Sequence, residues 1–329
     1  MLMRLFAVVV AAMFVAGCSL PSVLVTPVSA QTSLEETVVS PGNKRAKVLI
    51  VEVEGMLANT RAGGGILGAA ENKVSLLEQE LTVAAQDDSV KVVVLRVNSP
   101  GGTVAASEAM YDSVRRFKKA TGKPVLVQCQ DVAASGGYYV ACAGDEIYAQ
   151  NTSIVGSIGV IFQVVTVEQA MNNFGVRVES LKSGPLKDLG SPFNGLDAAE
   201  REVMQGMIDD FYAQFTGVVQ QHRSVADPSK AFDGRVFTAE QAKDIGLIDG
   251  VQSLPSTIKR ARELAGRDNA VVVMYRRPYG YAGSIYASSP LTQPTARPEQ
   301  LQLSVPALEA AGQSLTPMLT PGAYYLWRP

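Results

Sequence analysis

The stretch Lys91-Val-Val-Val-Leu-Arg-Val-Asn-Ser-Pro-Gly-Gly-Thr103 decides the fold class of this chain. Its first part, Val92 to Val97, is a largely apolar, β-branched run, which is typical of a strand buried on both faces. The Pro-Gly-Gly turn ends this strand, and Thr103 is a residue type that caps the start of a helix. Apolar residues at helical spacing follow. The stretch therefore predicts a strand, a tight turn and a helix.

The same unit recurs on both sides of this stretch. Upstream, residues 48–53 predict a buried strand and residues 74–84 carry apolar side chains at helical spacing. Downstream, residues 125–129 predict a third strand, and residues 131–139 lead from it into another helix. Strands that alternate with helices indicate βαβ units and a mainly parallel sheet, so we expect an α/β fold.

The rest of the chain predicts a folded domain over residues 46–276 and a Pro-rich, mostly disordered tail over residues 277–329. Within the domain we expect a helix near 167–174, a strand over 176–181, a long helix over 197–222, helices over 239–245 and 256–264, and a strand over 270–275.

The N-terminus has the pattern of an export signal. Arg4 precedes the apolar run 5–16, which is shorter than the roughly 20 residues that span a bilayer. Small residues then precede Cys18, an ending that resembles a bacterial lipoprotein signal, in which the cysteine carries the lipid. We expect residues 1–18 to be this signal, residues 19–45 to be a flexible tether, and the domain to be membrane-anchored outside the cytoplasm. An ordinary signal peptide or an uncleaved anchor is the alternative.

Composition argues against several functions. The chain has 29 basic and 31 acidic residues without a basic stripe, which argues against nucleic-acid binding. A zinc site or a Ser-His-Asp triad would depend on the single histidine, His222, which lies among polar residues where we expect a solvated side chain. We expect no metal or organic cofactor. Cys129 and Cys142 are expected to be buried free thiols, with a disulfide in an oxidising compartment as the alternative.

Two glycine-containing turns carry the elements of nucleophilic catalysis. Ser135 follows a predicted strand and precedes a helix, and its small neighbours leave room for a substrate carbonyl. The turn that ends at Gly102 can direct backbone N–H groups into open space, since no side chain blocks them. Taken alone, Ser135 can equally be a helix cap and the glycines an ordinary turn. A lysine can replace histidine as the base when burial lowers its pKa from about 10.4 toward 7, but composition does not single out one lysine.

Five sequence blocks resemble the signal peptide peptidase A family, peptidase family S49, and occur in that family's order. They are Val97-Asn-Ser-Pro-Gly-Gly102, Ala133-Ala-Ser-Gly-Gly-Tyr-Tyr139, Gly156-Ser-Ile-Gly159, Ser183-Gly-Pro-Leu-Lys-Asp188 and Asp233-Gly-Arg-Val-Phe-Thr238. The resemblance implies that Ser135 is the nucleophile and Lys187 the general base. It also implies that Gly102 and Gly136 supply the oxyanion N–H groups and that Ser157 holds the lysine amine.

The resemblance further implies a ClpP/crotonase-like spiral of ββα units and a homo-oligomeric ring, an octamer, in which Ser135 and Lys187 meet across a subunit boundary. The implied substrates are apolar peptides at the membrane, chiefly cleaved signal peptides. Two alternatives stay open at this point. A crotonase-like acyl-CoA enzyme is disfavoured by the export signal, because coenzyme A is cytoplasmic. A non-catalytic, peptide-binding envelope lipoprotein would lack a reactive serine.

Overall fold

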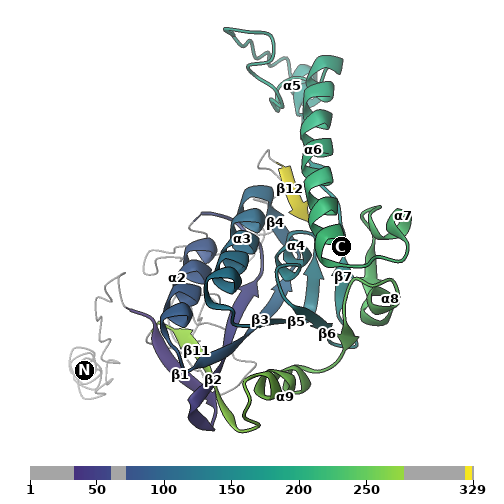
Figure 1. Cartoon of the computed structure of the whole chain (residues 1–329). Coiled ribbons are helices and arrows are strands. Elements are labelled where there is room, and N and C mark those ends of the chain that lie inside the picture. Colours follow the sequence, from purple (N-terminus) through teal and green to yellow (C-terminus); the bar gives the residue numbers. More distant parts are fainter. Residues whose placement is uncertain (1–32, 61–71, 278–322, 328–329) are drawn as a thin grey trace, which may run out of the picture. The chain divides into compact units, whose positions relative to one another are not determined.

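The computed structural model describes residues 33–60, 72–277 and 323–327 (Figure 1). The chain divides into two compact units, residues 1–33 and 34–329, and every described helix and strand belongs to the second. Cys18 and most of the expected tether lie outside the described residues. Within the described ranges, no helix has the length and apolar character needed to cross a bilayer.

A nine-stranded sheet forms the centre of the second unit. Most neighbouring strands are parallel; β1 runs antiparallel to β11, and β9 antiparallel to β7. Along the sheet the order is β1 (Glu35–Ser40), β11 (Ala270–Arg276), β2 (Asn43–Glu54), β3 (Val90–Ser99), β5 (Val125–Ala134), β6 (Glu146–Ala149) and β10 (Gly250–Val251), with β7 (Ile154–Gly156) paired to β5 and β9 (Val236–Thr238) paired to β7.

Helices cover both faces of this sheet, as the buried strands predict. One face packs against α2 (Lys73–Gln86), α3 (Val104–Thr121) and α4 (Gly136–Ala141), and the other against α9 (Leu254–Leu264) (Figure 1). Along β2, Leu49 and Val51 belong to the first core, whereas Val48 and Ile50 belong to the second. The side chains of one strand thus alternate between two apolar layers.

The remaining helices include the expected long one. They are α5 (Glu168–Asn173), α6 (Ala198–His222), α7 (Pro228–Ala231) and α8 (Ala239–Asp244). A capping box between Asp197 and Glu200 fixes the start of α6. Residues 161–203, which we call the arm, run from β8 (Ile161–Phe162) through α5 to the first turns of α6. The strand predicted over 176–181 is wrong: these residues are irregular and exposed, and no strand in the described part of the chain pairs with them.

Two strands lie outside the expected bounds of the domain. Residues 35–40, in the expected tether, form β1, which pairs with β11, and β2 begins at Asn43. Within the tail that we expect to be mostly disordered, β12 (Ala323–Leu326) joins β4 (Gly101–Thr103) and β8 in a separate three-stranded sheet. Local composition did not reveal either strand, because each is stabilised by partners that lie far away in the sequence.

Candidate active site

Three neighbouring parallel strands bring the candidate residues to one edge of the sheet. Ser99 in β3 lies opposite Ala133 in β5, and Ala134 lies opposite Gly156 in β7. The chain continues from these strand ends into Gly102, Ser135 and Ser157 respectively. The carboxyl edge of a parallel sheet is where such folds place their sites.

Ser135 is held in an unusual backbone conformation. Its φ is 51°, a left-handed value that non-glycine residues seldom adopt. The Ser135 amide donates to the carbonyl oxygen of Gly156 at 2.7 Å, and the Ser135 carbonyl accepts from Tyr139 at 2.9 Å in the first turn of α4. The residue is 1% exposed, and its Oγ has no hydrogen-bond partner among the described residues. A buried, unpartnered hydroxyl costs free energy, and a catalytic role is one reason for a protein to retain it.

The turn at Gly102 lies against this serine and is held by Leu57. The Leu57 amide donates to the carbonyl of Gly101, and the Thr103 amide donates to the carbonyl of Leu57, both at 2.8 Å. Since successive residues of an extended strand direct their N–H groups to opposite sides, the Gly102 N–H faces away from Leu57. A Cβ added at Gly101 would lie 2.7 Å from the Gly136 nitrogen. The two glycine turns are therefore in contact.

Ser157 lies beside Ser135 and also has a positive φ, of 50°; it is 8% exposed. Its amide donates to the carbonyl oxygen of Arg235 at 2.8 Å, which connects the site to the neighbouring strand β9. The structure thus brings together four of the five residues expected at the reaction centre: Gly102, Ser135, Gly136 and Ser157.

Lys187 is the expected residue that the structure does not bring to Ser135. It is exposed in the arm, and no hydrogen bond or ion pair among the described residues joins it to either serine. Two contacts with α6 show how far Lys187 lies from the site. Near Lys187, Gly190 lies against Met204 of α6. On the side of Ser135, the ring of Tyr139 in α4 lies 5.1 Å from that of Phe215 in α6. At about 1.5 Å per helical residue, these contacts are ~16 Å apart along α6.

His222 is half-buried, which corrects the expectation of a solvated side chain. Its Nε2 lies 2.7 Å from the hydroxyl of Tyr111, and the two rings meet edge to face at 5.8 Å. Burial and neighbouring cations lower the pKa of His222. Its contacts are those of a packed residue at the end of α6. Cys129 and Cys142 are free and buried as expected, and burial raises the pKa of each thiol to about 12.

Sequence reasoning missed the residues that support the site. The Ser99 hydroxyl donates to the carbonyl of Gly55 at 2.6 Å and accepts from the Gly101 amide at 3.0 Å. The side-chain oxygen of Asn98 accepts from the Val132 amide at 3.2 Å, which joins the ends of β3 and β5. Both residues lie in the Asn-Ser-Pro-Gly-Gly block, so this block was the sequence feature that could have identified them as supporting residues. Nothing in the sequence pointed to Leu57.

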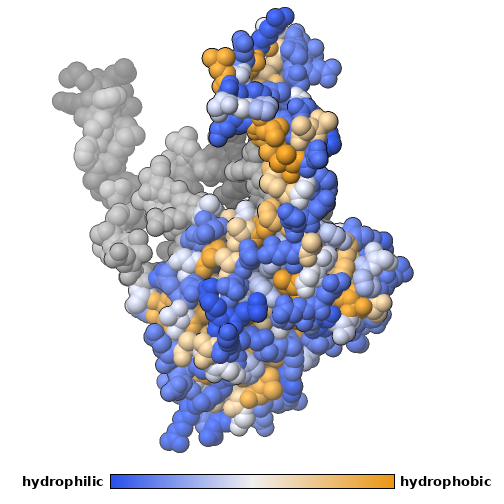
Figure 2. Space-filling model, turned by 45° about the horizontal axis from the view of Figure 1, so that its top comes forward, coloured by the Kyte–Doolittle hydropathy of each residue, from blue (hydrophilic) through white to orange (hydrophobic). Residues whose placement is uncertain are grey.

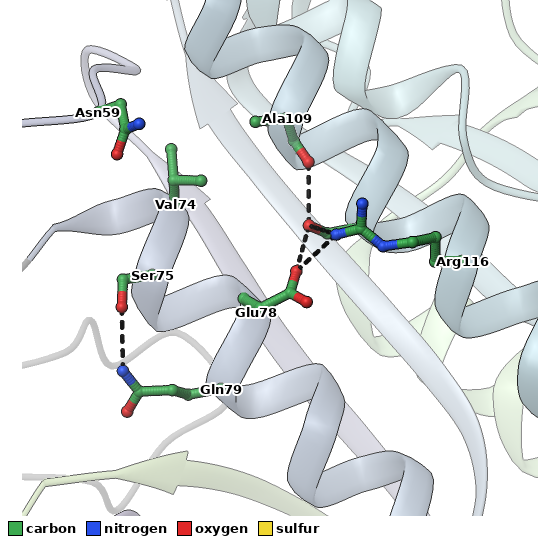
Figure 3. A pocket seen from close by; sticks show the side chains of 8 residues that line it. Asn59, Val74, Ser75, Glu78, Gln79, Ala109 and Arg116 are labelled. Atoms are coloured by element: carbon green, nitrogen blue, oxygen red, sulfur yellow. Dashed lines mark hydrogen bonds and ion pairs between the residues drawn. The ribbon is translucent and has the colours of Figure 1, made fainter.

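A separate cavity of about 370 Å³ lies between α2 and α3 (Figure 3). Glu78 and Arg116 form an ion pair across it at 3.0 Å, and Ser113 donates to Glu78. None of the candidate catalytic residues lines this cavity. We therefore place the active site at the carboxyl edge of the sheet and not in this cavity.

A large, mostly parallel sheet with helices on both faces fits the ClpP/crotonase-like fold class. A family model described as Clp protease matches residues 66–163, which confirms the ClpP/crotonase-like fold class. A second model, described as peptidase family S49, matches residues 117–268.

Relatives agree with these matches. A protein of Methanocaldococcus jannaschii named as a protease is 36% identical over 236 residues, 71% of this chain and 75% of that one. A protein of Enterococcus faecium named as signal peptide peptidase SppA is 30% identical over 76% of this chain and 73% of its own. The chloroplastic serine protease SPPA of Arabidopsis thaliana is 30% identical over 67% of this chain and 33% of its own length. This chain belongs to peptidase family S49 and is a serine protease.

Proposed function

We propose that the protein cleaves peptide bonds with a Ser135–Lys187 dyad. The observation that carries this proposal is the buried, unpartnered Oγ of Ser135 beside the glycine turns of Gly102 and Gly136. Ser135 Oγ attacks the substrate carbonyl carbon while the neutral amine of Lys187 takes the hydroxyl proton. The N–H groups of Gly102 and Gly136 stabilise the resulting oxyanion, and Ser157 holds the amine. The protonated lysine then returns the proton to the leaving amine, and water hydrolyses the acyl-enzyme.

The dyad is assembled between subunits of a ring in this proposal. Among the described residues, ten of the thirteen exposed large apolar side chains lie in the arm, including Phe174 at 86% and Leu181 at 96% exposure. Apolar residues gather along the arm in Figure 2. Apolar surface of this extent is typical of a protein–protein interface. A second copy that covers the arm would receive Lys187 next to its own Ser135. A head-to-tail interface forms a ring when the rotation between copies closes, and the proposed ring is the octamer that the family resemblance implies.

The substrates in this proposal are extended apolar peptides at a membrane, chiefly cleaved signal peptides. The protein is held there through Cys18, with its catalytic domain outside the cytoplasm. The export-signal pattern and the relatives' names support this location and these substrates. An acyl-CoA enzyme has no support from the family matches.

The direct test is active-site labelling with a fluorophosphonate, which reacts with nucleophilic serines. The wild-type protein should take up one label per chain and lose its peptidase activity, and Ser135→Ala should take up none. Ser153→Ala is a matched control, because Ser153 is also buried but its hydroxyl donates to backbone carbonyls. Labelling that persists in folded Ser135→Ala protein would contradict the assignment of Ser135 as the nucleophile.

A further inference from the structure

Residues 54–57, at the end of β2, lie against the turn that carries Gly102, and we call them the support segment. Leu57 lies opposite Gly102 in an isolated parallel bridge, and its backbone amide and carbonyl both bond to this turn. A Cβ added at Gly102 would collide with the carbonyl of Leu57, so the two backbones are in direct contact. Any shift of the support segment would therefore shift the Gly102 N–H as well.

Two side chains hold the support segment in place. Lys73 is the first residue of α2, and its Nζ donates to the carbonyl oxygen of Glu54 at 2.5 Å. A Cβ added at Gly55 would lie 3.0 Å from the same nitrogen. The Ser99 hydroxyl donates to the carbonyl of Gly55 at 2.6 Å. Two successive carbonyls thus accept from different elements, the first from Lys73 in α2 and the second from Ser99 in β3.

The position of Lys73 costs free energy for a lysine. The N-terminus of a helix carries partial positive charge, which disfavours a cation in the first turn. Burial also disfavours the charged amine and lowers the pKa of Lys73, with the Glu54 carboxylate opposing. A neutral side chain at the start of α2 would avoid both costs, but it would not supply the amine. What the lysine supplies in return is the hydrogen bond to the Glu54 carbonyl.

We propose that Lys73 is a positioning residue of the peptidase, which holds the support segment against the Gly102 turn and thereby directs the Gly102 N–H toward the oxyanion. This inference rests on the proposed peptidase function. Among the described residues no hydrogen bond joins Lys73 to Ser135, so Lys73 acts through the backbone. A donor must lie roughly 2.7–3.1 Å from the oxyanion, and a displacement of about 1 Å can reduce the rate ~100-fold.

Steady-state hydrolysis of a fluorogenic apolar peptide tests this role. Lys73→Met keeps an apolar stem of similar length and removes the amine. We expect kcat and kcat/KM to fall together by about 10- to 100-fold with KM unchanged, because the Gly102 N–H stabilises the transition state more than the bound substrate. The pH at half-maximal kcat/KM should not change, because Lys73 takes no proton in this role. A raised KM with unchanged kcat, or a shifted pH midpoint, would overturn the inference.

Lys123→Met is the matched control. Lys123 also donates to backbone carbonyls, those of Ala84 and Asp87 at the end of α2, and burial lowers its pKa as well. Both methionine variants should lower the midpoint of chemical denaturation, but only Lys73→Met should lower kcat. With an active wild-type enzyme, equal kcat values for the two variants would overturn the inference alone. A wild-type protein without peptidase activity would overturn the proposed function and the inference with it.

Amide hydrogen exchange of the full-length protein gives a readout that does not need catalysis. Lys73→Met should increase exchange in residues 54–57 and 99–103, and Lys123→Met should leave exchange there unchanged. Because Lys73 and Ser99 hold the same segment, the double variant Lys73→Met, Ser99→Ala should lose less kcat than the product of the two single losses. Unchanged exchange in Lys73→Met, or losses of kcat that multiply, would contradict a role through the support segment.

Discussion

The amide of Ser135 donates a 2.7 Å hydrogen bond to the carbonyl oxygen of Gly156, the residue before Ser157. Both serines have a positive φ, a conformation that costs about 1–3 kcal/mol and persists where the surroundings enforce it. Here the enforcement comes from strand pairing between β5 and β7. The two serines are therefore positioned by backbone structure that does not involve Lys187.

Because of this independence, Lys187→Ala should remove activity without affecting the fold. We expect kcat/KM to fall by about 10²- to 10⁴-fold, which is the contribution that a general base typically makes to the rate. The unfolding free energy should change by less than ~0.5 kcal/mol, because the residue is exposed. His222→Gln should keep kcat/KM within a few-fold of wild type. Peptide hydrolysis and thermal unfolding measure both variants, and an inactive but folded His222 variant would contradict the dyad.

His222 should instead affect stability at mildly acidic pH. Burial, then Lys118, Arg115 and Arg223, lower its pKa below the usual 6.5, with Asp145 opposing them. The unfolded chain then binds the proton more tightly, so His222 favours the folded state above pH 6.5. This contribution is lost as the pH falls through 6.5 toward the lowered pKa.

The measurement is the denaturation midpoint of wild-type protein and His222→Gln between pH 8 and pH 5. The wild-type protein should lose more stability over this interval, because the glutamine does not titrate. Parallel curves for the two proteins would show that the environment of His222 is not the one described.

Sequence patterns predicted the middle of the sheet, where β2, β3 and β5 follow one another both along the chain and in the sheet. The runs at 48–53, 92–97 and 125–129 became β2, β3 and β5, and the turns between strand and helix fell where glycine and capping residues indicated. The same arrangement explains why Gly102 and Ser135 lie together, since successive parallel strands end at one edge of the sheet.

The features that sequence patterns missed depend on distant partners. Leu57 contacts the Gly102 turn because β2 pairs with β3, and Tyr325 is buried against Tyr139 and Phe215, which come from two different helices. The tyrosines of β12 favour a strand, but β12 is only four residues long, follows a segment rich in proline and small residues, and pairs with strands that are distant in the sequence. The position of Lys187 relative to Ser135 likewise follows from the arm and not from spacing.

Two glycines should respond to alanine substitution in opposite directions. A Cβ at Gly102 would collide with the carbonyl of Leu57, so Gly102→Ala should lower the unfolding free energy by about 1–3 kcal/mol. Gly217 is exposed in α6 with nothing within 4 Å of an added Cβ. Gly217→Ala should therefore raise the unfolding free energy by about 0.5–1 kcal/mol. Chemical denaturation distinguishes the two, and equal effects would argue against the tight turn at Leu57.

Lipid attachment should depend on Cys18. Cys18→Ser should abolish incorporation of labelled fatty acid and leave the precursor unprocessed at that site, because the thiol carries the lipid. Cys129→Ala is the matched control: its thiol is buried in the folded domain, so the label should remain. Fatty-acid incorporation that persists in Cys18→Ser would refute lipid anchoring through this residue.

Shared active sites should allow two inactive variants to restore each other. Ser135→Ala supplies an intact Lys187, and Lys187→Ala supplies an intact Ser135. In a ring with equal, random incorporation, a site is complete only where the two variants are neighbours in the right order. Each variant fills its place with probability one half, so about a quarter of wild-type activity should return. The measurement is kcat per chain after co-expression of differently tagged variants and purification on both tags.

The control pairs Ser135→Ala with the double variant Ser135→Ala, Lys187→Ala, for which no activity should return, because no serine is present. Purification on both tags proves that the subunits mix. If mixed rings of the first pair stay inactive, each chain must supply both Ser135 and Lys187 to its own site. The arm would then have to bend along α6 to bring Lys187 to Ser135. That movement would have to span the ~16 Å along α6 between the contacts at Met204 and Phe215. Recovery near one quarter would instead assign the exposed apolar side chains of the arm to the subunit interface.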